Sequence, residues 1–336
     1  YFFIPYNVSH IQRYLKWKKI NEIFPVNVTG IVTARDSFVI SFDEKELKNR
    51  IIQFRNLSIS DDIIKRTYNL KDTRGWKLTS ARKKLSEDPY WDTYYQPILY
   101  RPFDFRKIYY TETMVDWGRP EVMHNLLEDN ISLCFMRQFS GSIPYTHFLV
   151  SEHIVDNRTF FSSKGIIQQA PLYLYNIKDD NNPKPSTNMM MVFEPATTYG
   201  KEPNISAIVF EKLEKTYNNR PTPEEILYYI YAVFYSNIYR ETYAEFLKID
   251  FPRVPFTSDH NTFKKMSNFG KKLADMHLLK SPLLDKPIAK YQGTGTNDRI
   301  EKVVYNEDEQ RIYINENKFF EGIEPDGVAA FLVLFP

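Results

Sequence analysis

Residues 100–110 read YRPFDFRKIYY, and this stretch decides how the middle of the chain folds. Its aromatic and β-branched residues favour extended strands. The same segment holds Arg101, Arg106, Lys107 and a single aspartate, Asp104. One interpretation is a packed pair of strands with an internal ion pair. The other is a surface that meets an anionic partner with flat rings.

Strand-like runs continue on both sides of this segment. Residues 91–188 contain ISLCFMRQF, THFLVSEHIV and APLYLY, which are rich in β-branched and aromatic residues and are separated by turn residues. One helix is expected between them at RPEVMHNLLED, where Pro120 suits the first turn. Residues 91–188 therefore form the strand-rich part of the chain.

Residues 1–90 are expected to mix helices and strands. DSFVISF alternates like a strand, and Asp43, Ser60 and Thr79 each stand where a helix begins. The third of these helices is basic, with the sequence SARKKL.

Residues 189–336 are expected to be mainly helical, with a β-hairpin at IEKVVYNEDEQRIYIN. Thr222 caps a tyrosine-rich helix that continues to Lys248, and another helix covers residues 261–279. The buried stripe predicted for the latter helix is Phe263, Met266, Phe269, Leu273 and Met276. The predicted fold class is mixed α+β, a strand-rich domain followed by a helical subdomain.

Composition excludes a disordered chain but does not identify a partner. Of 336 residues, 43% are hydrophobic, and the net charge is only +2. Positive charge gathers between Asp62 and Leu85, as in a solvated face or a surface that follows phosphates. The residues of this basic cluster are Lys65, Arg66, Lys71, Arg74, Lys77, Arg82, Lys83 and Lys84.

The single cysteine, Cys134, lies in an apolar run and is interpreted as a core residue. One cysteine allows no disulfide within the chain, which favours a reducing compartment such as the cytoplasm. No apolar run is long enough to predict a membrane span. Because the sequence starts with Tyr1 in the middle of a pattern, we expect it to be the C-terminal part of a longer protein.

Motifs that carry chemistry are not found. The sequence has no Pro-Pro dipeptide for a methyltransferase motif of the Asn-Pro-Pro-Tyr type, no phosphate-binding glycine loop, and no histidine pair four residues apart. Glu87, Asp88 and Asp92 are close in sequence but lack the lysine motif of a nuclease. We therefore predict no catalytic residue, no metal site and no cofactor in this chain.

Several stretches together resemble the C-terminal specificity region of type ISP restriction-modification enzymes and related adenine-specific DNA methylases. They are GIVTARDSF, YRPFDFRKIYY, RPEVMHNLL, FMRQF, THFLVSEHIVD and residues 224–256. The resemblance implies a target recognition domain for double-stranded DNA. It places adenine-N6 methylation and S-adenosylmethionine in a methyltransferase domain of the same polypeptide. After Gly322 the sequence AAFLVLFP departs from the pattern.

If the domain reads DNA, Arg101 and Arg106 are candidates for its DNA face, because arginine forks match the edge of guanine. Asp104 is a candidate for orienting one of these guanidinium groups. In the competing interpretation the arginine–aspartate pair links two strands, and the core residues are Tyr100, Phe103 and Tyr109. Since recognition sequences differ between relatives, the resemblance places most base contacts in less patterned loops.

Other candidates are weighed in the same way. Arg119 either contacts a phosphate or pairs with Glu121, and Arg137 and Gln138 either face DNA at a strand end or satisfy local backbone groups. Arg35 is expected to pair with its neighbour Asp36. The residues of the basic cluster that we select for phosphate contacts are Lys65, Arg66, Arg74, Lys77, Arg82 and Lys83.

The function expected from these residues and this resemblance is sequence-specific recognition of double-stranded DNA. One rival hypothesis is an autonomous nuclease or hydrolase with an unrecognised site. Another is a module that only holds an assembly together.

Overall fold

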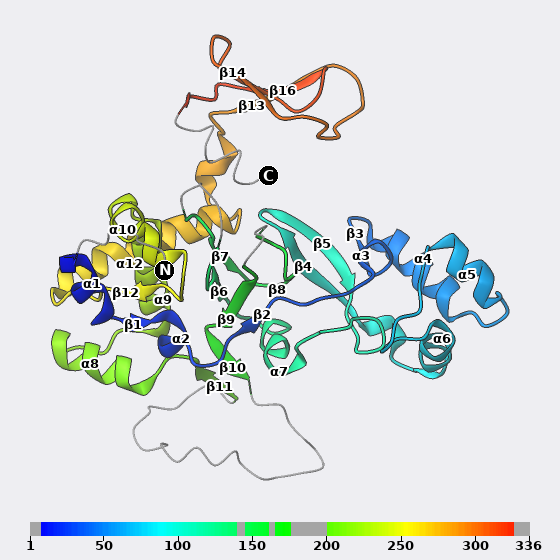
Figure 1. The fold of residues 1–336 in the computed structure, drawn as a ribbon, viewed down its shortest axis with the longest axis horizontal. Coiled ribbons are helices and arrows are strands. Elements are labelled where there is room, and N and C mark those ends of the chain that lie inside the picture. The colour runs from blue at the N-terminus through cyan, green and yellow to red at the C-terminus, as the bar shows by residue number, and fades with distance from the viewer. Residues whose placement is uncertain (1–7, 140–144, 161–164, 176–199, 326–336) are drawn as a thin grey trace. The chain divides into compact units, whose positions relative to one another are not determined.

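The computed structural model describes residues 8–139, 145–160, 165–175 and 200–325 (Figure 1). The chain divides into two compact units, residues 1–274 and residues 275–336. Helices and several separate sheets occur together, which confirms the predicted mixed α+β class. In the described ranges, no helix has both the length and the apolar content that crossing a membrane requires.

YRPFDFRKIYY forms strands, as predicted, and its hairpin lies at the centre of a four-stranded sheet in the first unit. The strand order is β3–β5–β4–β8, with β8 parallel to β4 and the other pairs antiparallel. The strands are β3 (Ile40–Ser41), β4 (Tyr95–Arg101), β5 (Asp104–Tyr109) and β8 (Ile154–Val155).

A second sheet of the same unit has the antiparallel order β2–β9–β6–β7. Its strands are β2 (Val28–Thr29), β6 (Ser132–Met136), β7 (Phe148–Ser151) and β9 (Ile167–Pro171). Cys134 on β6 is fully buried, as predicted, and burial raises the pKa of its thiol to about 12. The two sheets approach where Ile31 bridges Asp156. Gly30 permits this approach, because a Cβ there would lie 2.7 Å from the backbone of Asn157.

Three helices start at or next to the predicted residues: α4 packs on β3 and β5 of the first sheet, α6 packs on α4, and α5 packs on α6 (Figure 1). They are α4 (Glu44–Arg55), α5 (Asp61–Thr67) and α6 (Leu78–Glu87). The Asp43 carboxylate accepts a hydrogen bond from the backbone of Lys45, and the Ser60 hydroxyl accepts one from Ile63. Both are N-cap contacts, which satisfy backbone N–H groups that have no partner in the first turn.

The strand predicted at DSFVISF is wrong for its first half, which forms a helical turn, α3 (Asp36–Val39), before β3. Phe38, Val39 and Ile40 are consecutive, and each is at most 4% exposed. The backbone N–H groups of Phe38 and Val39 donate to the carbonyl of Arg35, which closes a helical turn and takes these residues out of strand geometry.

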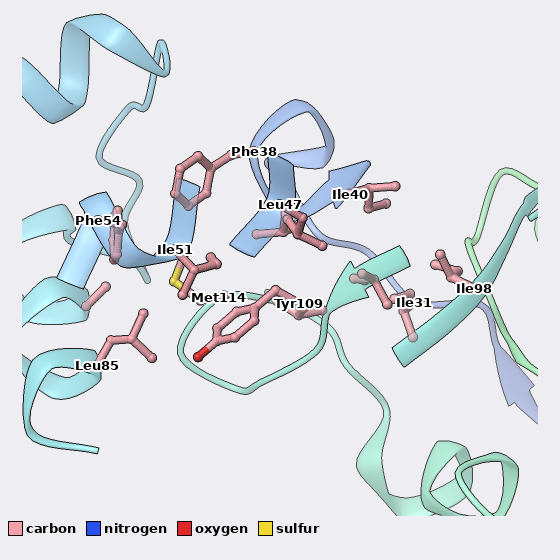
Figure 2. Close-up of a cluster of buried hydrophobic side chains, with 14 of the residues drawn as sticks. Ile31, Phe38, Ile40, Leu47, Ile51, Phe54, Leu85, Ile98, Tyr109 and Met114 are labelled. Carbon is pink, nitrogen blue, oxygen red and sulfur yellow. The ribbon is translucent and has the colours of Figure 1, made fainter. Parts of the chain in front are cut away.

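The main core of this region lies between α3, α4, α6 and the first sheet (Figure 2). Its labelled side chains point toward one another from both the helices and the strands. They are Ile31, Phe38, Ile40, Leu47, Ile51, Phe54, Leu85, Ile98, Tyr109 and Met114. This packing fixes the hairpin β4–β5 against a rigid layer.

The helical region contains α8 (Ala207–Tyr217), α9 (Pro223–Tyr235), α10 (Asn237–Thr242), α11 (Ala244–Leu247) and α12 (His260–His277). Thr222 and Glu225 form a capping box at the start of α9, which confirms the predicted start. The predicted continuous helix to Lys248 is wrong. Ser236 is extended and its hydroxyl accepts a hydrogen bond from the backbone of Tyr239, so it caps α10 and interrupts the helix.

Shorter elements complete the first unit. Strand β1 (Lys18–Lys19) pairs with β12 (Arg253–Val254), and β10 (Tyr173–Tyr175) pairs with β11 (Lys201–Pro203). The remaining helices are α1 (Val8–Leu15), α2 (Ile20–Ile23), η1 (Trp91–Thr93), α7 (Pro120–Met123) and η2 (His124–Leu126).

The second unit is built on an antiparallel sheet with the order β13–β16–β15–β14. Its elements are η3 (Pro282–Asp285), β13 (Lys290–Gly293), β14 (Val304–Asn306), β15 (Arg311–Tyr313) and β16 (Lys318–Glu321). The predicted hairpin is confirmed as β14–β15. The two further strands were missed because neither alternates between buried and exposed side chains: β13 is exposed throughout, and β16 is partly buried throughout. The segment AAFLVLFP lies outside the described residues.

Candidate nucleic-acid interface

The turn of the hairpin β4–β5 consists of Pro102 and Phe103, with Arg101 paired across it with Asp104. Proline fixes φ at the first turn position. Phe103 has a φ of 62°, a left-handed conformation that residues other than glycine rarely adopt. The end of the hairpin therefore has a defined and locally strained shape.

A β-bulge just before this turn re-aims the side chains of β4. Leu99 pairs with Phe105, but the next pair is Arg101 with Asp104, so Tyr100 is an extra residue. A bulge turns successive side chains toward the same side of a strand. Consistent with this, the guanidinium carbon of Arg101 lies 3.9 Å from the centre of the Tyr100 ring.

The guanidinium group of Arg106 is held along one edge by a carboxylate and is packed against two aromatic rings. Its Nε donates to both carboxylate oxygens of Asp104 at 2.9 and 3.1 Å, and its Nη2 donates to Oδ2 at 2.7 Å. Its guanidinium carbon lies 4.1 Å from the ring centres of both Phe42 and Tyr100. The contact predicted between Asp104 and an arginine is present, and it converts a flexible side chain into an oriented fork.

Arg101 is held by a different carboxylate. Its Nη1 donates to Asp156 at 2.7 Å and to the carbonyl of Tyr100 at 2.5 Å. Burial raises the pKa of Asp156, and the neighbouring Arg101 acts in the opposite direction. Asp156 was not predicted as a site residue, because its partner is 55 residues away in sequence.

Both arginines keep hydrogen-bond donors available. Within the described ranges, Nη1 of Arg106 has no hydrogen-bond partner, and neither do Nε and Nη2 of Arg101. Their side chains are 25% and 35% exposed, respectively. We call Tyr100, Arg101, Asp104, Arg106 and Asp156 the hairpin cluster.

The hairpin cluster is connected to the segment before α3. The Tyr100 hydroxyl donates to Asp36 at 3.0 Å, and Asp36 also accepts a hydrogen bond from Thr33. Burial, together with Asp36, raises the pKa of Tyr100. Tyr100 is thus part of a fixed network, and its ring serves as a platform for both guanidinium groups.

The ion pair predicted between Arg35 and Asp36 is wrong. Arg35 pairs with Asp116 at 2.6 Å, donates to the carbonyl of Met114 and lies 4.1 Å from the Trp76 ring centre. Asp36 is turned toward the hairpin cluster instead. The loop that contains Asp116 offers Arg35 a carboxylate and a carbonyl, and Trp76 adds a ring face, a combination that a neighbour in sequence cannot provide.

The basic cluster extends over α5, α6 and the loop between them. Of the residues selected for phosphate contacts, all except Arg82 are exposed. The exposed ones are Lys65, Arg66, Arg74, Lys77 and Lys83, and none forms an ion pair with another described residue. Their unpaired charges stay available to an external anion.

The prediction of Arg82 as a phosphate contact is wrong, because its side chain is only 1% exposed and cannot reach an external phosphate. It donates to the carbonyls of Phe54, Asn56 and Ile59, and it pairs with Asp61. The side chain therefore pins the loop between α4 and α5. Its position in a run of basic residues concealed this structural role.

The other predicted residues lie apart along the chain. Arg119 precedes α7 with a φ of 56° and lies 5.3 Å from the Trp117 ring centre; among the described residues it forms no ion pair with Glu121. Its Nε is buried without a hydrogen-bond partner within the described ranges. Arg137 and Gln138 are exposed directly after β6, and Arg137 lies 3.5 Å from Asp250.

One residue of this surface was missed by sequence reasoning. Phe42 lies between β3 and the cap of α4, in a run that alternates like a buried strand, yet its side chain is 71% exposed. Its position just before the N-cap is a signal, since an apolar residue there usually packs on the first turn of the helix. Here it contacts Arg106 instead.

Residues that would hold a metal do not gather in the described part of the chain. No group of three or more histidine, cysteine, aspartate or glutamate side chains is placed to bind an ion there.

Comparison with known proteins identifies a family. The family model described as "Type ISP C-terminal specificity domain" matches residues 22–329. None of the curated proteins is significantly similar in sequence.

Solved structures with a similar fold include three proteins in complexes with DNA or a DNA substrate mimic. The type ISP restriction-modification enzyme LlaBIII bound to DNA has 22% identity and a TM-score of 0.62, over 90% of this chain and 19% of that one. The DrdV–DNA complex has 21% identity and a TM-score of 0.62, over 89% and 29%. A nuclease-deletion mutant of LlaGI with a DNA substrate mimic has 20% identity and a TM-score of 0.58, over 93% and 28%. The chain thus spans less than a third of the length of each of these proteins.

Proposed function

This chain belongs to the type ISP C-terminal specificity domain family, and from that membership we propose that it recognises a specific sequence in double-stranded DNA. In this proposal it is the recognition domain of a bacterial restriction-modification enzyme. The solved structures of similar fold are complexes with DNA, which supports the same partner here.

The observation that carries the proposal is the pair of oriented arginines in the hairpin cluster. Each guanidinium is held by a carboxylate on one edge and lies against the ring of Tyr100. Each also keeps donors without a partner among the described residues, as an arginine that contacts DNA requires. We propose Arg101 and Arg106 as DNA contacts and Asp104 as the residue that orients Arg106.

The remaining contacts are proposed to be mainly with the DNA backbone. The exposed part of the basic cluster carries charges without carboxylate partners among the described residues, which suits phosphates. Arg119, Arg137 and Gln138 are proposed as further contacts.

The chemistry of the longer enzyme is proposed to lie in another domain. We propose that a methyltransferase domain of the same polypeptide binds S-adenosylmethionine and methylates adenine at N6. No residue of this chain is assigned to that cofactor, because the sequence lacks both the glycine loop and the Asn-Pro-Pro-Tyr type motif. We place the enzyme in the cytoplasm, where its proposed partner is found.

The proposal is tested by the variant Arg106→Ala. A binding selection from random-sequence duplexes with the 336-residue chain gives a preferred duplex, and fluorescence anisotropy then compares it with a scrambled duplex. We expect Arg106→Ala to weaken binding of the preferred duplex by about tenfold or more, since a good bidentate contact is worth roughly 1–3 kcal/mol. Arg299→Ala, which removes an exposed arginine of the second unit, is the control and should bind like wild type.

If Arg106→Ala bound the preferred duplex and the scrambled duplex with the same affinities as wild type, Arg106 would not belong to the proposed interface. Cleavage of DNA by the chain in the presence of Mg²⁺ would favour the nuclease hypothesis instead. Stable self-assembly without DNA affinity at low salt would favour a module that only holds an assembly together.

A further inference from the structure

The exposed ring of Phe42 has no evident role in the fold. Its side chain is 71% exposed, although it directly precedes Asp43, the cap of α4. An apolar residue at this position usually packs against the fourth residue of the helix, which is Leu47 here. Leu47 is instead fully buried in the core beneath the sheet. The Phe42 ring therefore leaves a large apolar surface in contact with water, which is unfavourable.

Phe42 is nevertheless placed by a specific contact. The guanidinium carbon of Arg106 lies 4.1 Å from its ring centre, and the same guanidinium lies 4.1 Å from the Tyr100 ring centre. Asp104 fixes that guanidinium, so it also restrains the ring that packs on it. The orientation of Phe42 is thus set by the hairpin cluster.

The surroundings of Phe42 are charged and internally satisfied. Glu44 pairs with Lys107 at 3.1 Å, and the Asp43 carboxylate caps the helix. A protein docking site would show several apolar side chains together, whereas Phe42 is flanked by buried Ser41 and exposed Asp43. A single exposed aromatic ring with polar neighbours suits a ligand that has an aromatic face and polar groups at its edge.

We propose that Phe42 stacks on a nucleobase that leaves the helical stack when DNA binds. This inference rests on the proposed function and adds a residue and a type of contact to it. Enzymes that modify a base take it out of the duplex, so unstacked bases are expected in such a complex. Stacking on a ring tolerates any base, because every base has an aromatic face.

The test compares three substitutions at one exposed position. Phe42→Ala removes the ring, Phe42→Leu keeps an apolar side chain without a ring, and Phe42→Trp keeps a ring. The probe is the preferred duplex, with 2-aminopurine substituted at each adenine in turn, because its fluorescence reports base stacking. We expect Phe42→Ala and Phe42→Leu to weaken binding by about 5- to 150-fold, the value of one stacked base, and Phe42→Trp to bind like wild type.

Two further readouts separate stacking from loss of fold or charge. The thermal midpoint should not change in any of the variants, since the side chain is exposed. The dependence of affinity on salt should also stay unchanged, because stacking displaces no counterions.

Tyr90→Ala is the control variant, and it should bind like wild type. Tyr90 is 66% exposed, and no cation lies over its ring among the described residues.

Wild-type affinity in Phe42→Ala, or full rescue by Phe42→Leu, would overturn the stacking contact while leaving DNA recognition intact. A wild-type chain that binds no duplex would overturn the proposed function and this inference together. Where the unstacked base is an adenine, its 2-aminopurine signal should differ between wild type and Phe42→Ala.

Discussion

Arginine serves two opposite purposes in this molecule, and its partners distinguish them. Arg82 donates to three backbone carbonyls and pairs with Asp61, so its donors are directed inward. Arg101 and Arg106 are each held by one carboxylate and keep donors that have no partner within the described ranges. An arginine bound by carbonyls supports a loop, whereas one oriented by a carboxylate can still bind a ligand.

The inward role of Arg82 predicts a large loss of stability when it is replaced. In Arg82→Met the side chain keeps a similar length but leaves the carbonyls of Phe54, Asn56 and Ile59 without their donor. We expect the free energy of unfolding to fall by about 3 kcal/mol, since buried groups that lose partners are costly. Urea denaturation measures this as a lower midpoint at an unchanged slope.

Lys83→Met is the matched control, because it removes the same charge one residue further along α6 from an exposed position. Its unfolding free energy should stay within about 0.5 kcal/mol of wild type. Equal stability of the two variants would show that the contacts of Arg82 are not needed to hold the loop between α4 and α5.

Sequence reasoning at this scale succeeded for local contacts and failed for distant ones. Asp104 and Arg106 are two residues apart on one strand, so their side chains point the same way and their contact was predictable. Arg35 pairs with Asp116, which is 81 residues away, and only the folded chain brings them together. Neither the bulge at Tyr100 nor the burial of Arg82 leaves a pattern in the sequence.

At the scale of elements, the packing of α9 and α12 shows why a helix can be predicted correctly while the residues on its buried face are predicted wrongly. The predicted position of α12 is confirmed to within two residues, but its predicted stripe is wrong at Phe269, which is 62% exposed. The buried residues besides Phe263 are small: Ser267, Gly270 and Ala274. Large apolar residues were predicted to face the core, but the close approach of α9 selects small ones.

This close approach predicts that Gly270→Ala destabilises the protein. A Cβ at Gly270 would lie 1.8 Å from the carbonyl oxygen of Tyr228 on α9, and backbone atoms cannot move aside as a side chain can. We expect the free energy of unfolding to fall by about 1–3 kcal/mol, although alanine favours a helix more than glycine does. Thermal unfolding followed by circular dichroism measures the change.

Gly75→Ala is the control, because a Cβ at Gly75 would meet no atom within 4 Å. It should be neutral or slightly stabilising, by at most about 1 kcal/mol. If Gly270→Ala were as stable as Gly75→Ala, the two helices would have room to separate without cost.

At the scale of the whole molecule, positive charge is divided between two kinds of site. A net charge of +2 gives little general attraction for DNA, so attraction depends on where the charges are. In the hairpin cluster, Arg101 and Arg106 are neutralised by carboxylates, which preserves directional donors but weakens the local field. In the basic cluster, Lys65 and its exposed neighbours form no ion pair with any described residue. The first kind of site suits specificity, and the second suits affinity for phosphates.

This division predicts different salt dependences for variants at the two sites. Replacing Lys65 and Arg66 together with glutamine should reduce the slope of log affinity against log salt by about 0.9 for each phosphate that the protein no longer neutralises. Arg106→Ala should change that slope less, because Asp104 already neutralises its charge, while reducing the preference for the selected duplex more. Anisotropy titrations over a range of salt concentrations with both duplexes measure both quantities.

The control replaces Lys265 and Lys272, two exposed lysines of α12, with glutamine and should keep the wild-type slope. If the Lys65 and Arg66 double variant also kept the wild-type slope, phosphate binding would have to be assigned to another part of the molecule.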